Sequence, residues 1–185
     1  MRAFIAIDLP EALRAALAGV QEALRIAARD ARWTRPDGIH LTLKFLGQIS
    51  DAQTQQVVEA LAQIGPFEPF SVEVKGFGFF PQARRPHVFW VGVVAPPALA
   101  ELAECVNSHL DKIGLAREER AFAPHFTLAR FHVQHPQPAM EEAIAARADP
   151  SLGKFEVSEF FLFESKLSPQ AAEYRKVMCF PRRRS

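Results

Sequence analysis

Apolar and polar residues follow strand-like and helix-like patterns in an order that occurs twice along the chain. In the first half, alternation predicts strands over residues 2–8, 39–46 and 70–80. Two helices fall between them, with apolar stripes at Leu13, Leu17, Val20, Leu24 and Ala27, and at Val57, Val58, Leu61 and Ile64. Pro10 opens the first helix, and Ser50 with Gln53 forms a capping-box signature for the second.

The second half repeats this order. Strands are predicted over residues 87–94, 124–131, 155–165 and 173–180, with one helix between Pro96-Pro97 and Gly114 and a shorter one over 138–148. We therefore expect an α+β fold in which residues 1–185 form a single domain of two intertwined lobes related by a pseudo-twofold axis. Each lobe would be an antiparallel sheet covered by helices, with an active-site groove between the lobes.

Bulk composition is that of a soluble globular protein and favours no partner. Hydrophobic residues make up 49% of the chain and charged residues 23%, and the net charge is +1, so any contact with nucleic acid has to be local. No apolar stretch approaches the roughly 18 residues that span a bilayer, and the N-terminal apolar run is too short for a signal-peptide core. We expect a cytoplasmic protein without membrane contact. The two cysteines are far apart, which argues against a disulfide framework and a cysteine zinc site.

Two His-x-Thr segments are the strongest chemical signal. The chain has four threonines, and two of them stand two residues after a histidine, in residues 40–43 and 125–128. Chance placement of 6 histidines and 4 threonines in 185 residues would give far fewer than one such pair. In a strand, residues two apart share a face, so each histidine lies beside its threonine. A shift of 85 residues superposes one segment on the other, as a duplication would.

Paired imidazoles and hydroxyls suit acid–base work at phosphorus. Histidine gives or takes a proton near neutral pH, and two of them provide an acid and a base at once. The threonine hydroxyls can donate to charged phosphoryl oxygens while the entering and leaving oxygens lie in line. Packing alone does not explain the pairs, because Leu or Val fills a core better than polar groups that need partners.

The remaining histidines show no metal-ligand spacing, so we expect neither a metal nor a cofactor. His132 and His135 stand in a proline-flanked connection without a nearby carboxylate, and His109 lies at the edge of a helical apolar stripe. His87 follows Arg84 and Arg85 at the start of a strand and is a candidate ligand contact.

Residues 40–47 and 124–130 closely resemble the two signature motifs of the two-histidine (2H) phosphoesterases. Within that superfamily the chain is similar to the RNA 2′,3′-cyclic phosphodiesterases, historically called bacterial and archaeal 2′-5′ RNA ligases. The likeness extends over nearly the whole chain, including residues 2–8, 84–86 and 163–167.

The resemblance implies a role for each motif residue. His40 would donate a proton to the leaving ribose oxygen and His125 would accept one from the attacking water. Thr42 and Thr127 would hold the non-bridging oxygens, and Arg130 would contact the phosphate. The implied reaction opens a terminal 2′,3′-cyclic phosphate to a 2′-phosphate without a metal, and its reversal would form a 2′-5′ bond. The implied partners are RNA ends, tRNA fragments among them, bound by a monomer.

Strand parity leaves several positions open. Arg130 is an odd step from His125 and would need a bulge to reach the same face, or else it forms a structural ion pair. By the same parity, Phe45 and Phe126 are expected in the core. Trp33 and Trp90 could stack a base or simply pack. Arginines that could contact RNA phosphates are Arg84, Arg85, Arg182, Arg183 and Arg184, although a solvated, disordered end is an equal reading of the last three.

The sequence leaves two other functions open. One is a phosphodiesterase that acts on small cyclic nucleotides, and the other is a non-catalytic module that binds RNA ends. A pure binder has no need of two proton-transfer groups.

Overall fold

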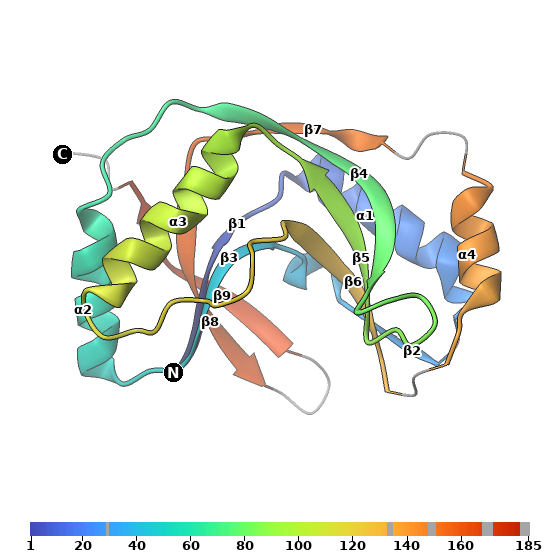
Figure 1. Ribbon diagram of the computed structural model, residues 1–185, viewed down its shortest axis with the longest axis horizontal. Helices are drawn as coiled ribbons and strands as arrows, with labels where there is room; N and C mark the ends of the chain where they lie inside the picture. Colours follow the sequence, from blue (N-terminus) through green and yellow to red (C-terminus); the bar gives the residue numbers. More distant parts are fainter. Residues whose placement is uncertain (29, 133–134, 148–150, 168–171, 182–185) are drawn as a thin grey trace.

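The computed structural model describes residues 1–28, 30–132, 135–147, 151–167 and 172–181 (Figure 1). Its elements, in chain order, are β1 (Arg2–Ile7), α1 (Glu11–Arg25), β2 (Ala31–Trp33), the 3-10 turn η1 (Pro36–Gly38), β3 (Leu41–Gln48), α2 (Asp51–Ala62), β4 (Phe70–Phe80), β5 (Val88–Val94), α3 (Pro97–Asp111), β6 (His125–Phe131), α4 (Pro138–Ala145), β7 (Ser151–Val157), β8 (Phe160–Leu167) and β9 (Ala172–Phe180). Among the described residues, no helix is both long and apolar enough to span a bilayer.

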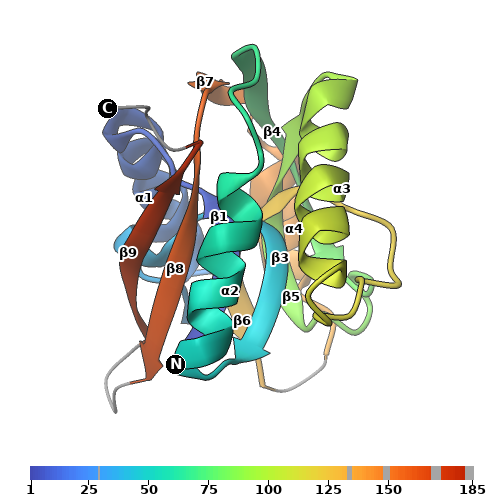
Figure 2. The ribbon, with the colours of Figure 1, turned by 90° about the vertical axis from the view of Figure 1, so that its left-hand side faces the viewer.

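The strands form two antiparallel sheets. The first has the order β3-β1-β8-β9, which Figure 2 shows side by side, and the second has the order β2-β6-β5-β4-β7. Each sheet combines strands from both halves of the chain: β8 and β9 complete the sheet of β1 and β3, and β4 joins the sheet of β5 and β6. The α+β class and the antiparallel sheets are confirmed.

Helices cover one face of each sheet and bury their apolar stripes there. The helices α2 and α3 contact each other. Against the first sheet, α2 contacts β9 and α3 contacts β3, whereas α1 contacts β7 of the second sheet. Figure 1 shows α2 and α3 at one end of the long axis and α1 and α4 at the other. The capping box at the start of α2 is present, because the Gln53 backbone N–H donates to Ser50 Oγ and the Ser50 N–H donates back to Gln53 Oε1.

The structure differs from the predicted elements at several places. The single strand expected over 155–165 is two strands, β7 and β8, which belong to different sheets and are separated by exposed Ser158 and Glu159. The short elements β2 and η1 were not expected. The helix expected over 138–148 ends at Ala145, and the stop signal expected at Asp149-Pro150 lies outside the described residues.

The two motif strands come together although they belong to different sheets. His40 immediately precedes β3 and His125 begins β6. These strands contact each other where the two sheets meet. We call the face of each sheet that carries its His-x-Thr pair the motif face. The motif face of the first sheet also holds a small apolar cluster, separate from the main core, of Phe4, Ala6, Phe161 and Phe163.

Candidate active site

The first motif holds its imidazole in an aromatic setting. The His40 ring stacks on Phe4 with centroids 4.4 Å apart and meets the edge of Tyr174 at 5.1 Å. Tyr174 reaches this position because residue 38 is glycine: a Cβ on Gly38 would lie 2.8 Å from a carbon of the tyrosine ring. The turn before His40 is fixed by Arg14, whose guanidinium donates to the carbonyl of Pro36 at 2.6 Å. The ring is therefore restrained on several sides.

Burial sets the protonation state of His40. Loss of water around the ring lowers its pKa to about 4, against opposing effects of the Asp8 charge and of a hydrogen bond with the Gly38 backbone. The imidazole is thus neutral at pH 7 in the free protein. A bound phosphate anion raises the pKa of an adjacent imidazole, since opposite charge favours the charged form. His40 can then acquire its proton when the anion binds.

Asp8 supplies a negative charge near His40. Its carboxylate contacts Arg14 at 2.7 Å and Lys176 at 2.6 Å. Burial raises the Asp8 pKa, but hydrogen bonding and the charges of Lys176 and Arg14 outweigh burial and leave this pKa below its usual value. The carboxylate is therefore ionised at neutral pH and partly offsets the burial of the imidazole.

The second motif presents an imidazole with a defined tautomer. His125 Nδ1 lies 2.7 Å from the carbonyl oxygen of Ala123. A carbonyl only accepts, so Nδ1 of the neutral ring carries the proton and Nε2 keeps its lone pair. The ring meets the edge of Phe80 at 4.9 Å. Burial is the main cause that lowers the His125 pKa, and the Arg130 charge adds to it. This geometry favours His125 as a proton acceptor near neutral pH.

Both motif strands contain a bulge at the residue after the threonine. In β3, Thr42 pairs with Ala6 but Lys44 pairs with Ile5, so Leu43 is the extra residue. In β6, Thr127 pairs with Trp90 but Ala129 pairs with Phe89, so Leu128 is extra. The two bulges are 85 residues apart and interrupt the alternation at the same place in each repeat.

The bulges decide which side chains follow the motifs on the motif face. Arg130 pairs with Val88, two residues from Trp90, and so joins His125 and Thr127 on their face. Regular alternation without a bulge would place Arg130 on the opposite face of the sheet. The expectation that Phe45 lies in the core is wrong for the same reason: the bulge turns it to the motif face, where it pairs with Phe4 and is 64% exposed. Phe126 is fully buried, as expected.

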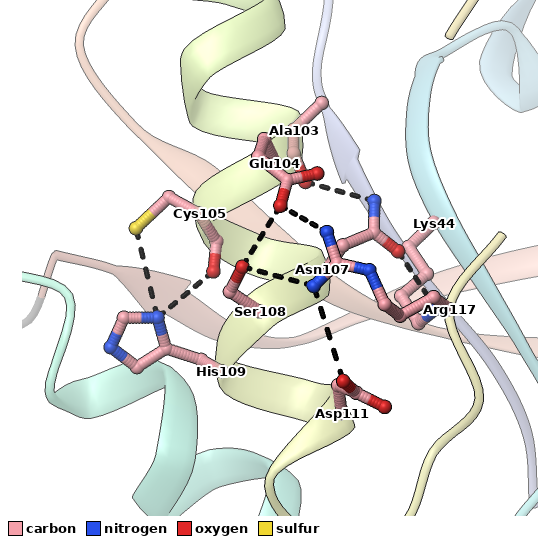
Figure 3. A network of polar contacts seen from close by, with 9 residues as sticks. All are labelled: Lys44, Ala103, Glu104, Cys105, Asn107, Ser108, His109, Asp111 and Arg117. Atoms are coloured by element: carbon pink, nitrogen blue, oxygen red, sulfur yellow. Dashed lines mark hydrogen bonds and ion pairs between the residues drawn. The ribbon is translucent and has the colours of Figure 1, made fainter. Parts of the chain in front are cut away.

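Buried polar side chains anchor both bulges. The bulge in β3 turns Lys44 toward α3, and its Nζ donates to Asn107 Oδ1 on that helix at 2.8 Å and to the carbonyl of Ala116 beyond the helix at 2.6 Å. Figure 3 shows this link beside the polar cluster around Arg117 on the helix surface. In the second sheet, Gln21 Nε2 donates to the bulge carbonyl of Leu128 at 2.9 Å.

Sequence reasoning did not single out Lys44 or Gln21. A visible signal existed for Gln21, since it stands four residues after Leu17 within the apolar stripe of the first helix. Lys44 offered none, because its partners are more than sixty residues away.

The other candidates do not converge on the motifs. Arg84 and Arg85 are exposed in the turn between β4 and β5. His109 Nδ1 bonds the Cys105 carbonyl one turn earlier on α3, and His135 pairs with Asp30 at 3.0 Å. The residues of the tail, Arg182 to Arg184, lie outside the described part of the chain.

The two tryptophans differ in position. Trp33 pairs with Ala129, on the face opposite the motif, and its edge packs on buried Phe89 at 6.2 Å. Trp90 lies on the motif face beside Thr127 and covers Gly78. Within the described residues, no group of three or more His, Cys, Asp or Glu side chains has the arrangement of a metal site.

Comparisons with known proteins agree with this geometry. The family description "LigT like Phosphoesterase" matches the chain twice, over residues 7–90 and 91–174. An RNA 2′,3′-cyclic phosphodiesterase of Methanothermobacter thermautotrophicus is 30% identical over 181 residues, which cover 97% of this chain and 98% of the relative. One from Thermotoga maritima is 33% identical over 176 residues, covering 95% and 92%. The crystal structure of Escherichia coli LigT complexed with 3′-AMP superposes with a TM-score of 0.77 at 27% identity, covering 97% of this chain and 96% of that one.

Proposed function

The chain belongs to the LigT-like phosphoesterase family, and we propose that it is an RNA 2′,3′-cyclic phosphodiesterase. Its relatives of that name match almost the full length of the chain. The observation that carries the proposal is the contact between β3 and β6, the two strands of separate sheets at whose starts the His-x-Thr segments lie. The substrate is the 2′,3′-cyclic phosphate end of an RNA, and tRNA fragments with such an end belong to this class.

The two imidazoles divide the proton transfers. His125 takes a proton from water through Nε2, and the resulting hydroxide attacks phosphorus. The bond from phosphorus to the 3′-oxygen breaks, and His40 gives that oxygen its proton, which leaves a 2′-phosphate and a 3′-hydroxyl. Thr42 and Thr127 donate to the non-bridging oxygens, and Arg130 balances their charge. His125 accepts the proton of the attacking water and His40 donates one to the leaving oxygen, so the scheme needs no metal.

Loss of either imidazole should remove most of the activity. Each proton transfer contributes about 10²- to 10⁴-fold, so His40→Ala and His125→Ala should each lose about that much in the rate of opening of a cyclic-phosphate oligonucleotide. His132→Ala, which alters an exposed histidine outside the motifs, is the matched control. Full activity in either motif variant would contradict the proposal. Phosphorus NMR of the product separates a 2′-phosphate from a 3′-phosphate and thus fixes the bond that breaks.

A sulfur substrate separates the two roles. When sulfur replaces the 3′-bridging oxygen, the leaving thiolate needs little help from an acid, because thiols have pKa values far below those of alcohols. This substrate should restore much of the activity of His40→Ala and little of that of His125→Ala. The opposite pattern would exchange the assigned roles.

Two further arms test the alternatives. Faster turnover of an adenosine 2′,3′-cyclic mononucleotide than of an oligonucleotide would favour a role on small cyclic nucleotides. Tight binding of cyclic-phosphate RNA without any product after long incubation would favour an RNA-end-binding module. We also propose a monomer, since one chain supplies both motifs, and sedimentation at working concentration tests this.

A further inference from the structure

Two arginines of the second sheet face each other beside the second motif. Arg32, in the short strand β2, is the cross-strand partner of Arg130 in β6. Residues directly opposite each other in an antiparallel pair point to the same face of the sheet. The next residue, Trp33, packs its edge on fully buried Phe89 on the core side, so alternation along β2 also directs Arg32 away from the core. Arg32 therefore lies on the motif face.

The positive charges of this pair have no counter-charge in the described part of the protein. Both Arg32 and Arg130 are exposed, and among the described residues neither guanidinium has an ion-pair or hydrogen-bond partner. Like charges directly opposite each other in a sheet are destabilising. The nearest positions of the motif face on β5 and β4 are Val88, Trp90 and Phe80, which carry no carboxylate. An anion bound at the pair would therefore stabilise this surface.

Hydrogen bonds to the second motif strand hold Arg32 in place. Just after β2, the backbone N–H of Thr34 donates to the carbonyl of Leu128 at 2.9 Å. The side chain of Gln21 donates to the carbonyls of both of these residues. These bonds join the end of β2 to the bulge that brings Arg130 to the motif face. One anchor thus positions both arginines.

The strand β2 also leads directly to the first motif. The chain continues from β2 through η1 to His40, which precedes β3, and β3 contacts β6. The Cβ atoms of directly opposite residues in a sheet are about 5 Å apart, so an anion at Arg32 would be a neighbour of the phosphate assigned to Arg130. Two anions so close together fit one substrate molecule with two phosphate groups.

We propose that Arg32 binds the phosphodiester on the 5′ side of the terminal nucleotide and so selects RNA chains over free cyclic nucleotides. The proposal rests on the proposed function, which places the cyclic phosphate against Arg130. The nearest further anion of an RNA substrate is the phosphate on the 5′-oxygen of the same ribose. A guanidinium can donate two parallel hydrogen bonds to such a group. A free nucleoside 2′,3′-cyclic phosphate has a neutral hydroxyl there and gains nothing from Arg32.

Three substrates with the same reacting ring test this contact. Adenosine 2′,3′-cyclic phosphate has no 5′ phosphate, a diadenosine with a terminal cyclic phosphate has one, and the same dinucleotide with a methylphosphonate linkage keeps the shape without the charge. Arg32→Gln should raise KM for the charged dinucleotide about 10-fold or more at low salt, the loss expected for one hydrogen bond to a charged group. KM for the two other substrates should change less than about twofold. A contact made equally before and during the reaction changes KM and leaves kcat unaltered.

Salt dependence and a lysine variant give independent readouts. Loss of one phosphate contact on a single strand should reduce the slope of log KM against log salt concentration by about 0.7 for the charged dinucleotide. Arg32→Lys keeps the charge and should retain most of the affinity. Removal of one of two facing like charges should leave Tm unchanged or raise it, so weaker binding would not come from unfolding.

Arg35→Gln is the matched control. It removes an exposed arginine three residues away that already pairs with Asp37 at 2.9 Å, and it should change KM for none of the substrates. An equal rise of KM for the mononucleotide and the charged dinucleotide in Arg32→Gln, or no rise for either, would overturn the role of Arg32 and leave the phosphodiesterase intact. The same conclusion would follow if the parent protein bound the methylphosphonate dinucleotide as tightly as the charged one. If the parent opened none of the three cyclic phosphates, the proposed function itself would fail, and the role of Arg32 with it.

Discussion

Replacement of Gln21 by leucine should weaken both the fold and the site, because this one side chain holds the bulge in β6. Its amide donates to the carbonyls of Thr34 at 2.7 Å and of Leu128 at 2.9 Å, and the residue is 1% exposed. Leucine fills a similar volume but donates nothing. The bulge that brings Arg130 to the motif face would then lose its anchor from α1.

The two lost hydrogen bonds differ in how much they lower the free energy of unfolding. The Leu128 carbonyl keeps a second donor, the backbone N–H of Thr34 at 2.9 Å. Loss of the hydrogen bond from Gln21 to this carbonyl therefore costs about 0.5–1.5 kcal/mol. The Thr34 carbonyl loses its side-chain donor in a poorly hydrated place, which costs about 1–3 kcal/mol. The free energy of unfolding should therefore fall by about 2–4 kcal/mol. For a chain of this length that corresponds to a Tm lower by about 4–16 °C.

Urea unfolding and steady-state kinetics measure the two consequences. Gln55→Leu is a matched control, since Gln55 is exposed on α2 and should change stability by less than about 0.5 kcal/mol. Among folded molecules, Gln21→Leu should lower kcat/KM for the cyclic phosphate by up to about 10²-fold through displacement of Arg130. The reasoning would be refuted if Gln21→Leu and Gln55→Leu unfolded at the same urea concentration as the parent.

Three other outcomes are expected. The folded-state pKa of His40, about 4, lies below its value of about 6.5 in the unfolded chain, so the unfolded state binds the proton first as pH falls. The free energy of unfolding should therefore fall by about 3 kcal/mol between pH 7 and pH 4. His40→Gln should remove this part of the pH dependence. If urea unfolding gave the same pH dependence for the parent and for His40→Gln, the buried, neutral ring would be contradicted. Gly38→Ala should push Tyr174 from His40 and lower Tm, whereas Gly19→Ala, where a Cβ meets nothing within 4 Å on a helix, should leave Tm unchanged or raise it. EDTA should leave the rate of cyclic-phosphate opening unchanged; activity lost on chelation and restored by a divalent cation would overturn the metal-free mechanism.

Local patterns predicted the elements well but could not assign them to sheets. The strand predicted over 155–165 includes Ser158 and Glu159, two polar residues in succession that interrupt the alternation, and there the chain leaves the second sheet and enters the first. This interruption marks a boundary, but a strand has the same period in either sheet, so the pattern does not show that the two parts belong to different sheets. The three-residue β2 is too short to show a period at all.

The same limit applies to the site. The shared face of each histidine and its threonine follows from alternation alone, because no bulge separates the two residues. Beyond the bulges, alternation fails at Phe45 and leaves Arg130 undecided. What fixes the bulges are bonds from distant parts of the chain, Gln21 to Leu128 and Lys44 to Asn107, which no local window of sequence contains.

Because both repeats belong to one chain, the two halves of the site can carry different residues at equivalent positions. A homodimer of one repeat would have to carry the same residue at both post-bulge positions, since symmetry copies every side chain. A single chain with two repeats is free of that constraint, and here one position holds Phe45 and the other Arg130. The fused repeat thus allows two equivalent positions to carry side chains of different chemistry.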